Sequence, residues 1–260
     1  MTRPLALPTR LLAAAATALL LGAAATTTAP RAAQRWASPA AHDDPAATAA
    51  LRVTERDVAA SNAKAAAAYE DLVGLWRGEL GRIGARFVAP ALVRYRVAAG
   101  TDCGVMRAGN ASYCAADNTI YFDEVFVAAQ AKRAAAATGA DGDMAGVGII
   151  AHEMGHAVAA QLGAVSRVPY ENEATADCLA GAFARHADEA GSLEKGDVDE
   201  AFFAMAMAGD PEPQLTGNRR LDRPIVLRAS LLGHGTYEQR TENFRSGMEG
   251  GAGACIEELR

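Results

Sequence analysis

Apolar residues recur at helical spacing along much of this chain. Residues 143–162 are apolar on nearly every side, so this helix should be buried and should end at Gly163. Residues 221–232 show no clear preference for helix or strand. The spacing of apolar positions predicts helices at residues 52–82, 124–137, 143–162, 171–188, 197–208 and 236–248.

Two short stretches have strand character. Residues 92–97 alternate between apolar and polar side chains, and residues 118–123 are rich in β-branched and aromatic residues. Several helices with a small β-sheet predict an α+β fold that is predominantly α.

The N-terminal segment is typical of an export signal. Arg3 and Arg10 precede an apolar run that ends in small residues. We therefore expect a signal peptide at residues 1–25, a flexible linker at 26–50 and a single domain at 51–260. The mature protein would be secreted, or extracytoplasmic. An uncleaved anchor is the alternative, and only in that case do we expect membrane association.

The net charge argues against one class of partner, and the cysteine content predicts disulfides. The 260 residues have a formal net charge of -6 and no basic run, which argues against nucleic acid as a partner. An exported chain with four cysteines should form two disulfides. Of the three possible pairings, spacing favours Cys103 with Cys114, which leaves Cys178 with Cys255. The alternative is that Cys178 is a metal ligand.

The stretch His152-Glu153-Met154-Gly155-His156 has the pattern H-E-x-x-H. On a helix, positions four apart lie on one face, so His152 and His156 can bind one Zn²⁺ ion. Glu153 is then placed to act as general base. The apolar flanks favour a buried metal site over two surface histidines.

A catalytic zinc usually has three protein ligands and one water. Glu173 is the best third ligand. Asp177 follows it by four residues on the same helix face and can accept a hydrogen bond from a metal-bound imidazole. Glu171 is the competing third ligand, and an ordinary solvated carboxylate is the alternative for Asp177.

The ordered patterns H-E-x-G-H, E-x-x-A-D-C-x-A-G and H-G-T-x-E-Q-R resemble the bacterial neutral zinc metallopeptidase family. Here they begin at His152, Glu173 and His234, and residues 113–123 also resemble a segment of that family. The resemblance spans roughly residues 95–257. It implies a gluzincin-type, zincin-like domain in which the H-E-x-x-H helix packs on a second helix carrying the glutamate ligand.

General zinc-hydrolase chemistry then assigns further roles. Glu153 takes a proton from water and passes it to the leaving amine. His234 is the candidate donor to the tetrahedral oxyanion, with a capping or packing histidine as the alternative. The resemblance also suggests that Thr119–Asp123 is an edge strand that pairs with an extended substrate.

The resulting hypothesis is an exported zinc-dependent endopeptidase that acts on a peptide or protein. One alternative is an exported, wall-associated or interaction protein whose zinc is structural, with Cys178 or His234 as a fourth ligand. Another is an amidase that acts on cell-wall peptides.

Overall fold

The computed structural model describes residues 51–210, 213–257 and 259, which form seven helices and five strands. The mostly helical α+β class predicted from the sequence is confirmed. The expected signal peptide, 1–25, and linker, 26–50, lie outside the described residues. Of the helices in the described part, none combines the length and the apolar character that a membrane span needs.

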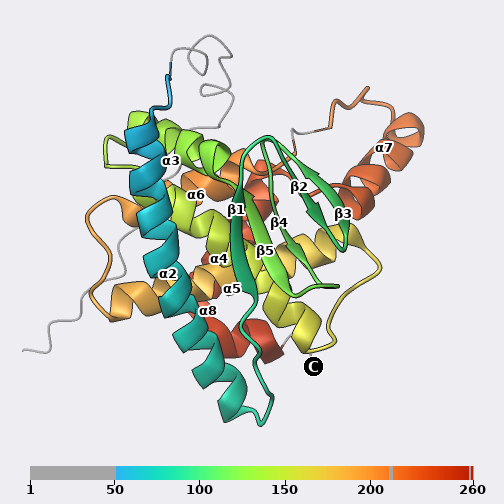
Figure 1. The fold of residues 1–260 in the computed structure, drawn as a ribbon. Coiled ribbons are helices and arrows are strands. Elements are labelled where there is room, and N and C mark those ends of the chain that lie inside the picture. The colour runs from blue at the N-terminus through green and yellow to red at the C-terminus, as the bar shows by residue number, and fades with distance from the viewer. Residues whose placement is uncertain (1–50, 211–212, 258, 260) are drawn as a thin grey trace, which may run out of the picture. The chain divides into compact units, whose positions relative to one another are not determined.

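Three strands form the larger sheet, in the order β1 (Ala91–Tyr95), β5 (Thr119–Asp123), β4 (Ala111–Cys114) (Figure 1). β1 is parallel to β5 and β4 is antiparallel to it. The expectation that Thr119–Asp123 is an edge strand is therefore wrong, because this strand lies in the middle. β1 and β4 are the two edge strands of this sheet, and the sequence did not predict β4.

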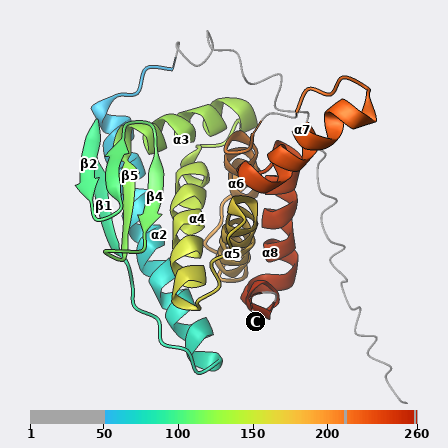
Figure 2. The ribbon, with the colours of Figure 1, turned by 90° about the vertical axis from the view of Figure 1, so that its right-hand side faces the viewer.

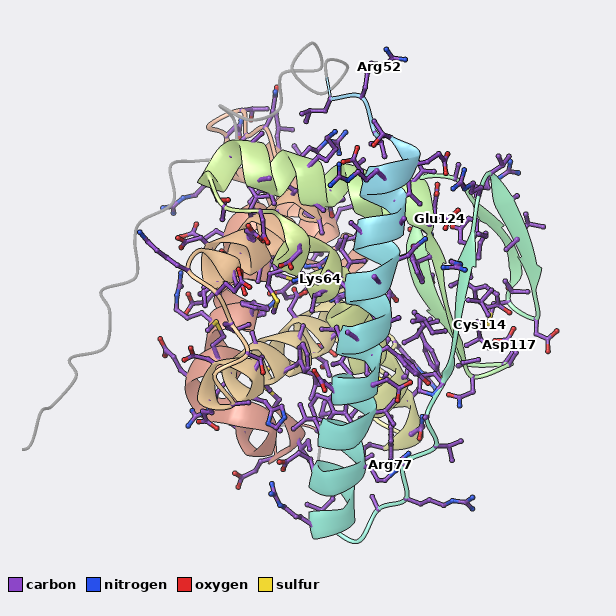
Figure 3. The ribbon with its side chains drawn as sticks, turned by 60° about the vertical axis from the view of Figure 1, so that its left-hand side comes forward. Arg52, Lys64, Arg77, Cys114, Asp117 and Glu124 are labelled. Carbon is purple, nitrogen blue, oxygen red and sulfur yellow. A yellow bond between two sulfur atoms is a disulfide. The ribbon has the colours of Figure 1, made fainter. Side chains whose placement is uncertain are left out.

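The segment between the two predicted strands holds three more strands. β2 (Ala98–Thr101) and β3 (Gly104–Arg107) form an antiparallel hairpin, and β4 follows. Cys103 in the hairpin turn is bonded to Cys114 at the end of β4, which Figure 3 labels. This predicted disulfide ties the hairpin to the sheet.

Local capping explains where two helices begin. α2 (Glu55–Arg82) starts at Thr54, whose side chain and that of Asp57 cap each other's backbone N–H groups. α3 (Glu124–Thr138) starts directly after β5, where the Asp123 carboxylate accepts the N–H of Val125 at 2.9 Å.

α4 (Asp143–Gln161) contains the H-E-x-x-H pattern and is buried along most of its length. It lies between the sheet on one side and α5, α6 and α8 on the other (Figure 2). The buried Glu200 of α6 (Asp197–Met207) caps its start by accepting the N–H groups of Gly142 at 2.5 Å and Met144 at 3.0 Å. α4 is thus held at its N-terminus by another helix.

α5 (Pro169–Glu189) and α8 (Tyr237–Glu257) pack closely and are joined by the predicted Cys178–Cys255 disulfide. A Cβ on Gly247 would overlap the carbonyl oxygen of Cys178, so only glycine allows this approach. α8 extends past the predicted end at 248, across a kink at Gly251. The ambiguous stretch is a helix, α7 (Arg219–Leu232).

Candidate metal centre

Two neighbouring helices bring His152, His156 and Glu173 together. The ligand atoms of these three residues lie within 4.8 Å of one another. His152 Nε2 is 3.2 Å from Glu173 Oε2, and His156 Nε2 is 3.5 Å from Glu173 Oε1. The two imidazoles come from successive turns of α4 and the carboxylate comes from α5, as the sequence suggested.

Gly155, inside the H-E-x-x-H pattern, makes this approach possible. A Cβ at Gly155 would lie 2.8 Å from the carbonyl oxygen of Ala176 on α5. Any larger residue would push α5 away from α4 and move Glu173 off the two imidazoles. The glycine is thus a packing requirement of the metal centre itself.

The donor set fits zinc. Two imidazole nitrogens and one carboxylate oxygen are ligands that Zn²⁺ favours, and three protein ligands are typical of a catalytic zinc. Across residues 51–210 and 213–257 this group contains three side chains. His152 is 7% exposed, while His156 and Glu173 are half-buried and open toward solvent.

Asp177 orients His152. Its Oδ1 lies 2.9 Å from His152 Nδ1, and the residue is fully buried one turn after Glu173 on α5. A proton on Nδ1 satisfies this contact, so in the neutral ring the lone pair is on Nε2, the nitrogen beside Glu173. The carboxylate therefore selects the tautomer that a metal ligand requires.

Arg240 on α8 is a member of this centre that the sequence reasoning missed. It is 3% exposed, its Nη1 donates to Glu173 Oε2 at 3.0 Å, and its Nη2 donates to Asp177 Oδ1 at 2.8 Å. Its Nε lies 2.6 Å from Asp177 Oδ2. The available signal was its position at the end of the His234-to-Arg240 motif, in which only the histidine was predicted to act.

Burial, charge and hydrogen bonds shift the pKa values of His152 and Glu173 in the metal-free protein. Burial and the charge of Arg240 act to lower the pKa of His152, but hydrogen bonds with Asp177 and Glu173 outweigh them and raise it to about 9. Burial acts to raise the pKa of Glu173, but hydrogen bonds with His152 and His156 hold it far below its ordinary value. Glu173 is thus ionised whenever a metal could bind.

Glu153 is held by the sheet. The backbone N–H of Tyr113 in β4 donates to Glu153 Oε2 at 2.8 Å, and Glu153 is 7% exposed. The glutamate lies between the two imidazoles in the sequence of α4. A backbone donor at this position fixes the rotamer of the carboxylate beside the metal ligands.

Other predicted residues lie outside the ligand group. The His234 side chain is 66% exposed, with Nδ1 3.6 Å from Asp210 Oδ1, so its role as an oxyanion donor stays a prediction. Glu171 is exposed and accepts a hydrogen bond from the Ser166 hydroxyl. Cys178 is bonded to Cys255, which excludes it as a metal ligand while that bond is intact.

Known proteins resemble this chain in sequence. No solved structure shows a significant match. The chain is 33% identical over 192 residues to "Uncharacterized protein YpfJ" of Escherichia coli strain K12, and equally so to the protein of that name from E. coli O6:H1 strain CFT073. The matches cover 68% of this chain and 63% of each relative, so it spans less than two thirds of their length.

A family model described as "Putative neutral zinc metallopeptidase" matches residues 11–258. That match includes both helices of the metal centre as well as Arg240. The chain therefore belongs to the neutral zinc metallopeptidase family.

Proposed function

We propose that this protein is an exported zinc-dependent endopeptidase. One observation carries the proposal: His152, His156 and Glu173 converge while Glu153, beside them on α4, is held by the Tyr113 N–H. Three ligands and an oriented carboxylate are what metal-assisted peptide hydrolysis needs. Export rests on the character of residues 1–25 alone.

Each side chain has a separate task. A zinc ion bound here would polarise the scissile carbonyl and lower the pKa of a water molecule to about 7. Glu153 accepts the proton of the attacking water and transfers it to the leaving amine. Asp177 keeps the His152 ring in the required tautomer, and Arg240 holds the carboxylates of Asp177 and Glu173.

The free edge of β4 is the proposed binding site for an extended substrate. The N–H of Tyr113 points to Glu153, so the backbone groups of this residue face away from β5 and toward α4. Because the Tyr113 N–H is already bonded to Glu153, an extended peptide would pair with the other outward backbone groups of β4 and would lie along this carboxylate. A substrate N-methylated at one paired amide should have a higher KM than its parent. Equal KM values at every position would rule this pairing out.

A structural zinc would need a fourth protein ligand. Among the described residues the ligand group has three members, and neither Cys178 nor His234 belongs to it. The geometry thus favours a catalytic zinc over the structural zinc of a non-catalytic binding protein. Cell-wall peptides remain within the proposed substrate class.

The decisive experiment is Glu153→Gln in the mature chain. Zinc content should stay at one ion per protein, while hydrolysis of a peptide library should fall by about 10²-fold or more, because the general base is lost. Glu171→Gln, at the exposed competitor, is the matched control and should keep both zinc and turnover. Unchanged turnover in Glu153→Gln would refute the proposal.

A further inference from the structure

A cavity of about 480 Å³ is lined by Tyr113 of β4 and by the C-terminal end of α4. Tyr113 belongs to both sites, because its N–H holds Glu153 and its residue lines the cavity. Ala160 forms another part of the wall, one helical turn after His156 on α4. One turn is about 5.4 Å, so the cavity can take a side chain close to the scissile bond of a substrate.

The cavity also continues the free edge of β4. Ala115 and Asn118 line it, and they lie in the turn that leaves β4 and enters β5. A peptide paired with the edge of β4 and extended past Tyr113 would therefore pass over its mouth. The methyl groups of Ala115, Ala160 and Val88 supply apolar walls.

The neutral polar groups of the cavity already have partners. The Gln161 amide accepts the N–H of Val88 at 2.8 Å and donates to its carbonyl at 2.8 Å. The Tyr113 hydroxyl donates to Asn118 Oδ1 at 2.9 Å. These contacts fix the side chains that line the cavity. They leave the amide groups of Gln161 and Asn118 with little capacity to form hydrogen bonds to a ligand.

Arg86 differs from the other lining residues. It bears the one charge among them, it is exposed, and within the described part of the chain it pairs with no carboxylate. An unpaired guanidinium at the rim of an apolar cavity is suited to a carboxylate on an aliphatic stem.

We propose that this cavity, the Arg86 subsite, takes an acidic side chain of the substrate. The proposal rests on the proposed peptidase function and names the substrate class: peptides with a glutamate or aspartate near the cleaved bond. Arg86 sets the preference through charge, and the three methyl-bearing walls accept the stem of the side chain.

The test uses pairs of peptides that differ only in carrying Glu or Gln at one position. A separate pair is made for each position that flanks the cleaved bond. At one position the wild-type protein should show about fivefold higher kcat/KM for Glu, the size expected of an exposed ion pair. In Arg86→Gln the ratio should fall to about one, and Arg86→Glu should favour Lys over Gln. Arg77→Gln, at an exposed arginine on α2 (Figure 3), is the matched control and should keep the wild-type ratio.

A binding measurement separates this proposal from the peptidase function. In zinc-loaded Glu153→Gln protein, the Glu peptide should bind about fivefold more tightly than the Gln peptide, and adding Arg86→Gln should abolish the difference. Absence of turnover in the wild type with this preference intact would refute the peptidase function alone. Equal dissociation constants at every position, or a preference that survives Arg86→Gln, would overturn the Arg86 subsite.

Discussion

Arg240 on α8 and Asp177 on α5 form a buried, two-pronged ion pair at the metal centre, with Nε 2.6 Å from Oδ2 and Nη2 2.8 Å from Oδ1. The same guanidinium reaches Glu173, and the same carboxylate holds His152. The pair therefore links α8 to two candidate metal ligands. It also supplies a cation to the buried Asp177 carboxylate, whose other partner is the His152 ring.

Removing Arg240 should be costly. Arg240→Gln removes the cation of a buried ion pair, so the free energy of unfolding should fall by about 3–5 kcal/mol. Zinc affinity should fall by about 10- to 100-fold because the orientation of the ligands is lost. Denaturant unfolding and metal titration would measure the two effects. Arg245→Gln, which breaks the Arg245–Glu242 pair on the same helix, is the control and should cost about 1 kcal/mol or less.

A double variant distinguishes packing from metal-ligand positioning. Arg240→Gln with Asp177→Asn removes both charges, so part of the lost stability should return. Zinc affinity should stay low, because His152 no longer has its carboxylate acceptor. Recovery of zinc affinity together with stability would show that the ion pair acts on the fold alone.

Glu173 and Glu171 are two residues apart but should differ sharply in zinc retention. Glu173→Ala removes one of three converging ligands, so the zinc dissociation constant should rise by more than about 100-fold. Glu171→Ala removes an exposed contact with Ser166 and should leave zinc binding near the wild-type level. Competition with a chromophoric chelator would rank the two, and the opposite ranking would exchange their roles.

Zinc binding should release a proton. Because the pKa of His152 is raised to about 9 in the metal-free protein, its ring is protonated near neutral pH and must become neutral to bind metal. Calorimetry at about pH 7 in buffers of different ionisation enthalpy should detect about one proton released per zinc. Zinc affinity that does not change between about pH 7 and 9 would contradict this shift.

The same shift affects metal-free stability. The folded pKa of His152 lies above its ordinary value of 6.5, so its protonation stabilises the fold fully below pH 6.5. That contribution is lost as the pH rises through about 9. Thermal unfolding of metal-free protein should therefore occur at lower temperature at the alkaline end of this range.

Glu200 should matter for stability although it lies away from the metal ligands. Glu200→Ala leaves the N–H groups of Gly142 and Met144 without their acceptor, which should cost about 1–3 kcal/mol. Asp199→Ala, on the same helix but only half-buried, should cost about 1 kcal/mol or less. Equal losses in the two variants would mean that Glu200 does not cap α4.

Periodicity in the sequence located most helices within a few residues, because apolar spacing and capping are local properties. The start of α3 after Asp123 and the end of α4 before Gly163 are examples. Strand order was not accessible in this way. β1 pairs with β5 across the whole β2–β3–β4 segment, and no local signal says which strand keeps a free edge.

The features of the metal centre likewise fall into those that local sequence determined and those that depended on the fold. The sequence by itself determined His152, His156 and Glu153, because helical spacing puts them together wherever the helix lies, and it pointed to Glu173, Asp177 and both disulfides. Only the tertiary structure brought α5 against Gly155, placed the N–H of Tyr113 on Glu153 and put Arg240 rather than the His234 ring beside the ligands. Those contacts join residues far apart in the chain, and their geometry depends on how whole helices and strands pack.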